Sequence, residues 1–130
     1  MISKKFLFEE MKFYQNNPSE EYVRAQLLID SASNMIDLGS GENPHPKAKA
    51  AIDKFIDPIQ RNYGKRGTIS IEKLHERGVR FVQAELESLP FEDDEFDLAY
   101  SHHVLEHVDD PLGACSEIIR IAKAGVFFYT

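Results

Sequence analysis

A short apolar run that ends in two closely spaced glycines constrains the fold of this 130-residue chain more than any other feature. The stretch from Met35 to Pro46 reads MIDLGSGENPHP, which predicts a buried strand that runs directly into a tight turn. Gly39 and Gly41 carry no Cβ, so backbone N–H groups in this turn can come close to a ligand. Pro44 and Pro46 lack an N–H donor. We therefore expect an extended loop in place of the regular helix that often follows such a turn.

Strands and helices are expected to alternate along the chain. The patterns predict helices over residues 4–16, 19–33, 70–76 and 111–124, and strands over residues 35–38, 50–53, 80–83, 96–101 and 126–129. In the second helix, the buried side chains should include Tyr22, Val23, Leu27 and Leu28. In the last helix, one apolar face should be formed by Leu112, Cys115, Ile119 and Ala122. Such alternation is typical of an α/β domain with a parallel sheet. We expect residues 1–33 to form a helical segment that packs on an α/β domain at residues 34–130.

Composition excludes several classes of protein. The net charge of −7 disfavours a nucleic-acid-binding surface, and the single Cys115 excludes an internal disulfide framework. No apolar run approaches the ~20 residues needed to span a membrane. Glu9 and Glu10 interrupt the N-terminal apolar run, so we expect no signal peptide and a cytoplasmic protein.

Charge is also unevenly distributed along the chain. Residues 47–80 hold nine Lys or Arg and four Asp or Glu, whereas residues 81–119 hold eleven acids and no Lys or Arg. Two solvated faces of one domain would explain this pattern. The alternative is a basic rim, formed by Arg61, Lys65 and Arg66, beside an anionic substrate.

Polar residues follow the predicted strands at the points where ligands bind in open α/β sheets, beyond the carboxyl ends of the strands. Asp53 ends the second predicted strand of the sheet, where a carboxylate can accept hydrogen bonds from a ribose diol. Glu85 follows the third, and Ser101 and His102 lie at the end of the fourth.

Taken together, the segments IDLGSG, AELESLPF and FDLAYSHHVLEHVDDP resemble class I S-adenosylmethionine-dependent methyltransferases of the group with a DLGxG … LPFxDxxFD … VLEHVxDP pattern. The resemblance covers about residues 33–130. It implies a Rossmann-like, mostly parallel sheet flanked by helices, and S-adenosylmethionine as the cofactor. The family fold has seven strands, and the last two are not present in this chain.

The resemblance also implies roles for individual residues. The turn formed by Asp37, Gly39, Ser40 and Gly41 would hold the methionine end of the cofactor, and Asp53 would bind the ribose hydroxyls. Glu85 would face the adenine amino group, and Leu86 would offer its backbone N–H to the adenine ring. Ser101 and His102 would line the methyl-transfer pocket.

Histidines supply the candidate general bases, because they titrate near neutral pH. His102 and His103 are the two candidates, although lining the pocket and packing against the fold are competing roles for them. The run His103, Glu106, His107 matches only in part the Glu-x-x-Glu-His metal-binding run of some methyltransferases. We therefore predict no metal site.

The sequence ends within or just after the fifth strand of the sheet, so Val126–Tyr129 would be an exposed apolar edge. A fragment of a longer protein is the favoured explanation. The alternative is a homodimer in which a second subunit covers this edge.

The sequence thus predicts a methyltransferase that acts on an unidentified small-molecule acceptor, such as a metabolite or a sugar. One alternative is a non-catalytic module that keeps the fold and binds the cofactor or a partner chain. A domain that binds NAD or a nucleotide sugar is disfavoured, because the turn lacks the GxGxxG spacing and the helix after it.

Overall fold

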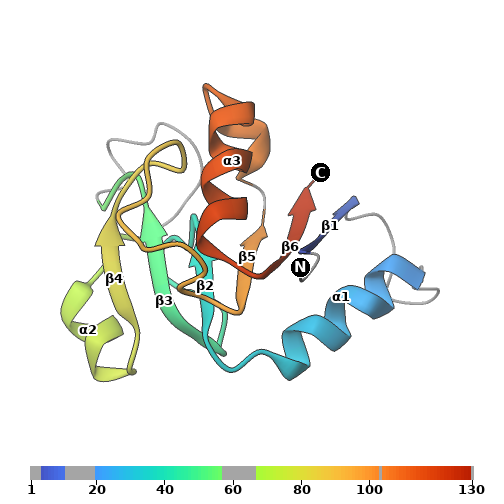
Figure 1. Cartoon of the computed structure of the whole chain (residues 1–130). Helices are drawn as coiled ribbons and strands as arrows, with labels where there is room; N and C mark the ends of the chain where they lie inside the picture. Colours follow the sequence, from blue (N-terminus) through green and yellow to red (C-terminus); the bar gives the residue numbers. More distant parts are fainter. Residues whose placement is uncertain (1–3, 11–19, 57–66, 103, 130) are drawn as a thin grey trace.

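The computed structural model describes residues 4–10, 20–56, 67–102 and 104–129, which form a six-stranded sheet with helices on both faces (Figure 1). The elements are β1 (Lys5–Glu10), α1 (Glu20–Ser31), β2 (Met35–Leu38), β3 (Ala48–Asp53), α2 (Ile71–Glu76), β4 (Arg80–Gln83), β5 (Leu98–His102), the short 3₁₀ helix η2 (Leu105–His107), α3 (Pro111–Ile121) and β6 (Ala124–Tyr129). The strand order is β1-β6-β5-β2-β3-β4, and every pairing is parallel. The predicted α/β class is therefore confirmed. Within the described ranges, no helix is long and apolar enough to cross a membrane.

The strand order changes direction beside β2, and this change places the ligand site. From β2 the chain adds β3 and β4 on one side, then returns to add β5 and β6 on the other side. Loops that leave β2 and β5 at their carboxyl ends therefore diverge, which opens a crevice between them.

Alternate residues of the strands enter the two faces of the sheet, as expected for strands that are covered on both sides. On one face, Ile118 and Ile121 of α3 pack against side chains such as Ile36 and Ala99. On the opposite face, Ala25 and Ile29 of α1 pack against Met35, Leu98 and Val126. Figure 1 shows α1 and α3 on opposite sides of the strands.

The predicted buried faces of both long helices are only partly correct: Ala122 is buried, and Tyr22 and Leu28 pack partly against the core, but the other predicted positions differ. Leu112 is 84% exposed and Ile119 is 46% exposed, while Ala114, Ile118 and Ile121 face the sheet. In α1, Val23 and Leu27 are likewise exposed, and Ala25 and Ile29 are buried instead. Both helices carry apolar residues on more than one face, so the pattern alone does not select the stripe that docks on the sheet.

The N-terminal prediction also fails, because residues 5–10 form the strand β1 rather than part of a helix over residues 4–16. β1 pairs in parallel with all of β6. The edge of β6 is therefore covered by this chain itself, and the basis for a homodimer through that edge is lost. Gly125 belongs to β6, and the Phe6 and Phe127 rings would lie within 2.6 Å of a Cβ placed there.

Asp97 ties the corner between α1 and β2 to the start of β5. Its Oδ2 accepts hydrogen bonds from the Ser33 backbone N at 2.7 Å and from the Ser33 Oγ at 2.8 Å, and its Oδ1 accepts one from the Asn34 N at 3.1 Å. Burial alone would raise the pKa of Asp97, but these hydrogen bonds outweigh it and hold the pKa below its usual value. The carboxylate is therefore a charged acceptor of three donors.

We expect Asp97→Ala to lower the free energy of unfolding by about 1–3 kcal/mol at pH 7, because it leaves these donors without their acceptor. A folded-state pKa below the unfolded one stabilises the protein above the unfolded value of ~3.9, and this contribution is lost as pH falls through the folded pKa. Urea unfolding at pH 7 and at acidic pH measures both effects. The control is Glu76→Ala, at an exposed residue of α2. An Asp97→Ala variant as stable as the control, or a difference that does not shrink with acid, would contradict this account.

Candidate functional site

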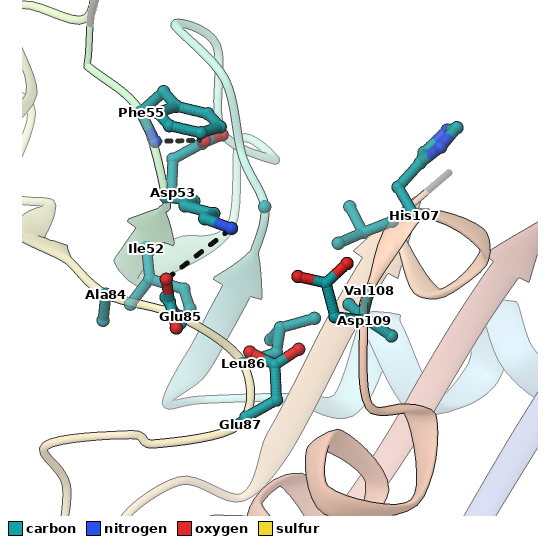
Figure 2. Close-up of a pocket in the computed structure, with 13 residues that line it drawn as sticks. Ile52, Asp53, Phe55, Ala84, Glu85, Leu86, Glu87, His107, Val108 and Asp109 are labelled. Atoms are coloured by element: carbon teal, nitrogen blue, oxygen red, sulfur yellow. Dashed lines mark hydrogen bonds and ion pairs between the residues drawn. The ribbon is translucent and has the colours of Figure 1, made fainter. Parts of the chain in front are cut away.

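Two cavities lie at the carboxyl ends of the strands, and Gly39 lines both of them. The first, here called cavity 1, has a volume of about 210 Å³ and lies between the ends of β3 and β4 and the segment that precedes α3 (Figure 2). The second, cavity 2, has a volume of about 600 Å³ and surrounds the glycine turn and the end of β5. Together they fall within the range of ~300–1,000 Å³ that is usual for small-ligand pockets.

The glycine turn after β2 folds back onto the end of β3. Gly39 and Gly41 have φ angles of +81° and +61°, which a residue with a Cβ rarely adopts. The N–H groups of Gly39 and Ser40 donate to the Ile52 carbonyl at 2.8 and 3.0 Å, and the Gly41 N–H donates to Asp53 Oδ2 at 2.8 Å. The expectation that these backbone donors face a ligand is therefore wrong. Gly39 instead contributes to the lining of both cavities.

Asp53 stands at the end of β3, as the sequence predicts, and lines cavity 1. Its side chain is almost fully buried, and its Oδ1 also accepts a hydrogen bond from the Phe55 N–H at 3.2 Å. These backbone bonds fix the orientation of the carboxylate at the edge of the cavity (Figure 2).

The walls of cavity 1 are acidic. Glu85 and Leu86 line it, as expected, together with Glu87 and Asp109, two carboxylates that sequence reasoning did not assign to the site. Figure 2 shows Glu85 and Glu87 on one wall and Asp109 on the other. Lys54 also lines cavity 1, and its Nζ lies 3.6 Å from Glu85 Oε1. A ligand that carries phosphate groups would be repelled by this lining.

Asp37 and Ser40 of the turn line cavity 2. Asp37 is buried, and its Oδ2 accepts a hydrogen bond from the His45 backbone N–H at 2.8 Å. Ser40 Oγ donates to the Gly41 carbonyl at 3.0 Å. No helix forms between Gly41 and Ala48, which confirms the expected extended loop.

His45 and Tyr100 are members of cavity 2 that the sequence analysis missed. Their rings meet edge to face at 4.9 Å, and His45 Nδ1 accepts a hydrogen bond from the Lys47 N–H at 3.1 Å. The network therefore assigns the proton of the neutral ring to Nε2. The pKa of His45 is lowered, mainly by burial and then by the positive charge of Lys47. The pKa of Tyr100 is raised to about 12, mainly by burial and then by the negative charge of Asp37. Both side chains are thus neutral hydrogen-bond donors at neutral pH.

The predicted site residues at the end of β5 lie in different environments. His102 lines cavity 2, where its ring lies edge-on to Phe128 at 6.1 Å. Ser101 is buried and lines neither cavity, and its hydroxyl has no hydrogen-bond partner in the part of the chain that the structure describes. His103 lies outside the described residues.

Other charged candidates also fall partly outside the described structure. The side chain of Glu106 and the basic residues Arg61, Lys65 and Arg66 are not among the described groups. Arg77, at the end of α2, is a basic residue that does line cavity 2. Among the described residues, no cluster of three His, Cys, Asp or Glu side chains is arranged to hold a metal ion.

The sheet is Rossmann-like, with a glycine turn after β2 and an acid at the end of β3. This arrangement is typical of domains that bind nucleoside-containing cofactors. Residues 36–130 match the methyltransferase domain family. The chain therefore belongs to this family, the class I S-adenosylmethionine-dependent methyltransferases that its motifs resemble.

Relatives of known sequence and structure agree with this assignment. An uncharacterized methyltransferase of Mycobacterium sp. (strain JLS) is 29% identical over 92% of this chain and 52% of its own length. The cycloartenol-C-24-methyltransferase 1 of Oryza sativa subsp. japonica is 40% identical over 84% of this chain and 33% of its own. A solved methyltransferase of Thermotoga maritima, described as a possible histamine N-methyltransferase, is 25% identical with a TM-score of 0.53, over 78% of this chain and 46% of that one. This chain thus spans about half the length of the mycobacterial relative.

The approach of Gly39 to Val104 gives a test of the turn geometry. A Cβ on Gly39 would lie 2.3 Å from Val104 Cγ2, in addition to the strain of its positive φ angle. We expect Gly39→Ala to lower the free energy of unfolding by about 2–4 kcal/mol, and Val104→Ala in the same chain to recover part of that loss. The double variant should remain less stable than Val104→Ala alone by about 1–3 kcal/mol, because the backbone strain at position 39 is still present.

Urea unfolding of the two single variants and the double variant measures the coupling between these positions. The control is Gly78→Ala, where φ is also +81° but nothing lies within 4 Å of the added Cβ. Strictly additive losses for Gly39→Ala and Val104→Ala would contradict the contact.

Proposed function

We propose that this chain is the cofactor-binding part of an S-adenosylmethionine-dependent methyltransferase that transfers a methyl group to a small-molecule acceptor. The observation that carries the proposal is a buried acid at the end of β3, Asp53, in a cavity whose described lining includes the carboxylates of Glu85, Glu87 and Asp109. S-adenosylmethionine contains a ribose and an adenine but no phosphate, and its sulfonium and amino groups are positive.

The structure disfavours a dinucleotide for three physical reasons. The N–H groups of Gly39, Ser40 and Gly41 are already bonded to the end of β3, so they do not cradle an anion. No helix N-terminus follows the turn before Ala48, so the usual dipole for a pyrophosphate is absent there. The carboxylates around cavity 1 add repulsion. The residues present therefore fit S-adenosylmethionine better than NAD.

In this proposal Asp53 accepts hydrogen bonds from the ribose hydroxyls, and Glu85 accepts one from the adenine amino group. Leu86 gives the adenine an apolar contact and a backbone N–H. Gly39 is shared by both cavities, so the cofactor would cross its face, with the methionine end toward Asp37 in cavity 2.

The cofactor supplies an electrophilic methyl carbon, which an acceptor atom attacks in line while the carbon–sulfur bond breaks. The protein mainly has to hold the acceptor in that line and exclude water. We assign acceptor binding to cavity 2, where His45 Nε2–H and the Tyr100 hydroxyl can donate hydrogen bonds. His102, in the same cavity, is the candidate base for an acceptor that must lose a proton, and His103 is the second candidate.

A small-molecule acceptor agrees with the names of related proteins. The matches include the rice cycloartenol methyltransferase and, at 26% identity over 79% of this chain, a demethylmenaquinone methyltransferase of Renibacterium salmoninarum. A metabolite or a sugar is therefore a reasonable class. The second candidate function is a module that binds the cofactor without catalysis, and it is motivated by the half-length match to the mycobacterial relative.

Calorimetric titration with S-adenosylmethionine, S-adenosylhomocysteine and NAD tests the proposal. We expect the first two to bind and NAD not to bind. Asp53→Ala should weaken binding about 5- to 150-fold, because charge-assisted hydrogen bonds to the ribose are worth about 1–3 kcal/mol. Glu85→Ala should have a smaller effect, because the contacts of Leu86 remain.

Asp53 also holds the glycine turn, so a ligand analogue must separate recognition from folding. Wild type should prefer S-adenosylhomocysteine over its 2′-deoxy analogue, and Asp53→Ala should lose this preference. The control is Asp30→Ala, at an exposed residue of α1. NAD binding, or an unchanged preference in Asp53→Ala, would overturn the cofactor assignment. Binding without methylation of any acceptor in a panel would favour the non-catalytic module.

A further inference from the structure

The segment that follows Leu86 is attached to α3 by a set of polar contacts that the cofactor assignment does not use. Arg120 Nη2 donates to the Leu89 carbonyl at 2.9 Å, and Nη1 donates to the Phe91 carbonyl at 2.7 Å. Glu117 Oε2 accepts a hydrogen bond from the Leu89 N–H at 2.9 Å. Two side chains of one helix thus satisfy three backbone groups of one loop.

The two side chains also fix each other. Arg120 Nε lies 3.1 Å from Glu117 Oε1, and Nη2 lies 2.8 Å from Oε2, which is the parallel two-bond geometry that suits a guanidinium and a carboxylate. A further bond joins Arg120 Nη1 to Asp93 Oδ1 at 3.1 Å. The hydrogen bonds from Arg120 hold the pKa of Glu117 below its usual value, so the pair stays charged at neutral pH. We call Glu117 and Arg120 the α3 clamp.

The same helix carries the opposite wall of cavity 1. α3 begins at Pro111, two residues after Asp109, and Val108 and Asp109 line the cavity across from Leu86 and Glu87 (Figure 2). One wall is thus joined to α3 through the chain, and the other wall is joined to α3 through the clamp. Because α3 is one continuous helix, it sets the separation of the two walls.

We propose that Glu117 and Arg120 are positioning residues that hold the wall from Glu85 to Glu87 at a fixed distance from the wall formed by Val108 and Asp109, and so define the slot for the adenine ring. The inference rests on the proposed function, since it assigns the adenine to cavity 1. Neither clamp residue lines the cavity. Their effect on the ligand is therefore exerted through the loop.

The apolar anchors of the loop do not depend on the clamp. Leu89 and Phe91 are buried in the main core, and the Phe91 ring packs edge to face on Phe96 at 5.1 Å. Loss of the clamp should therefore loosen the loop without unfolding the domain. Because the apolar anchors hold the loop without the clamp, a positioning role of the clamp can be distinguished from a structural one.

The test uses Arg120→Gln and Glu117→Gln, with Arg24→Gln as the matched control. Arg24 forms the same type of pair, with Glu21 one turn earlier in α1, at 3.2 Å. We expect each clamp variant to bind S-adenosylhomocysteine about tenfold more weakly, and the double variant to lose little more than either single variant. Arg24→Gln should bind as wild type does.

The discriminating readout is the preference for S-adenosylhomocysteine over its inosine analogue, which lacks the 6-amino group. A loosened slot should reduce this preference in the clamp variants, whereas a purely structural loss would leave it unchanged. Arg120→Lys should not restore it, because an ammonium cannot span two carbonyls and a carboxylate. Full recovery in Arg120→Lys, or an unchanged preference in all clamp variants, would overturn the proposal.

Hydrogen exchange of the ligand-free chain separates this proposal from the proposed function. Amides of residues 85–89 should exchange faster in Arg120→Gln than in wild type or Arg24→Gln. Unchanged exchange would overturn the clamp even if the cofactor binds. If Arg120→Gln exchanges faster but wild type binds no adenosyl ligand, the clamp would position the loop as proposed. The assignment of the slot to adenine would then be overturned.

Discussion

The hydrogen bonds between the turn after β2 and the end of β3 determine the shape of the whole site. They fold Gly39 and Gly41 back onto Ile52 and Asp53, and so they use the donors that could otherwise cradle a phosphate. The same bonds orient the Asp53 carboxylate at the edge of cavity 1 and hold Gly39 where it lines both cavities. This local constraint removes the backbone donors that a pyrophosphate would need, and it supports the proposal of a cofactor without phosphate groups.

The parts of this account that the sequence predicts are those with a local physical cause. Glycine spacing and the two nearby prolines predict the turn and the absent helix, because each acts on its own backbone. Apolar runs bounded by turns predict β2, β3, β4 and β5 to within a few residues at each end. Asp53 is correctly placed at a strand end in a cavity, since parallel strands present their carboxyl ends at one edge of the sheet.

The failures come from contacts between distant segments. Residues 5–10 become a strand because β6 offers an apolar partner along its full length, which helical spacing does not reveal. His45 joins the site only because the turn brings it onto Tyr100, 55 positions later in the chain. The α3 clamp likewise joins Arg120 to Leu89 and Phe91, which are distant from it in the sequence. Each of these depends on tertiary packing that no local pattern encodes.

The most direct measurement is a backbone NMR titration of the chain with S-adenosylhomocysteine. The account predicts that the amide signals of Gly39, Asp53, Leu86 and Val104 shift together and saturate at one dissociation constant, while those of α1 do not move. Shifts confined to other surfaces, or none at all, would contradict the claim that the turn and the end of β3 form a site for an adenosyl cofactor.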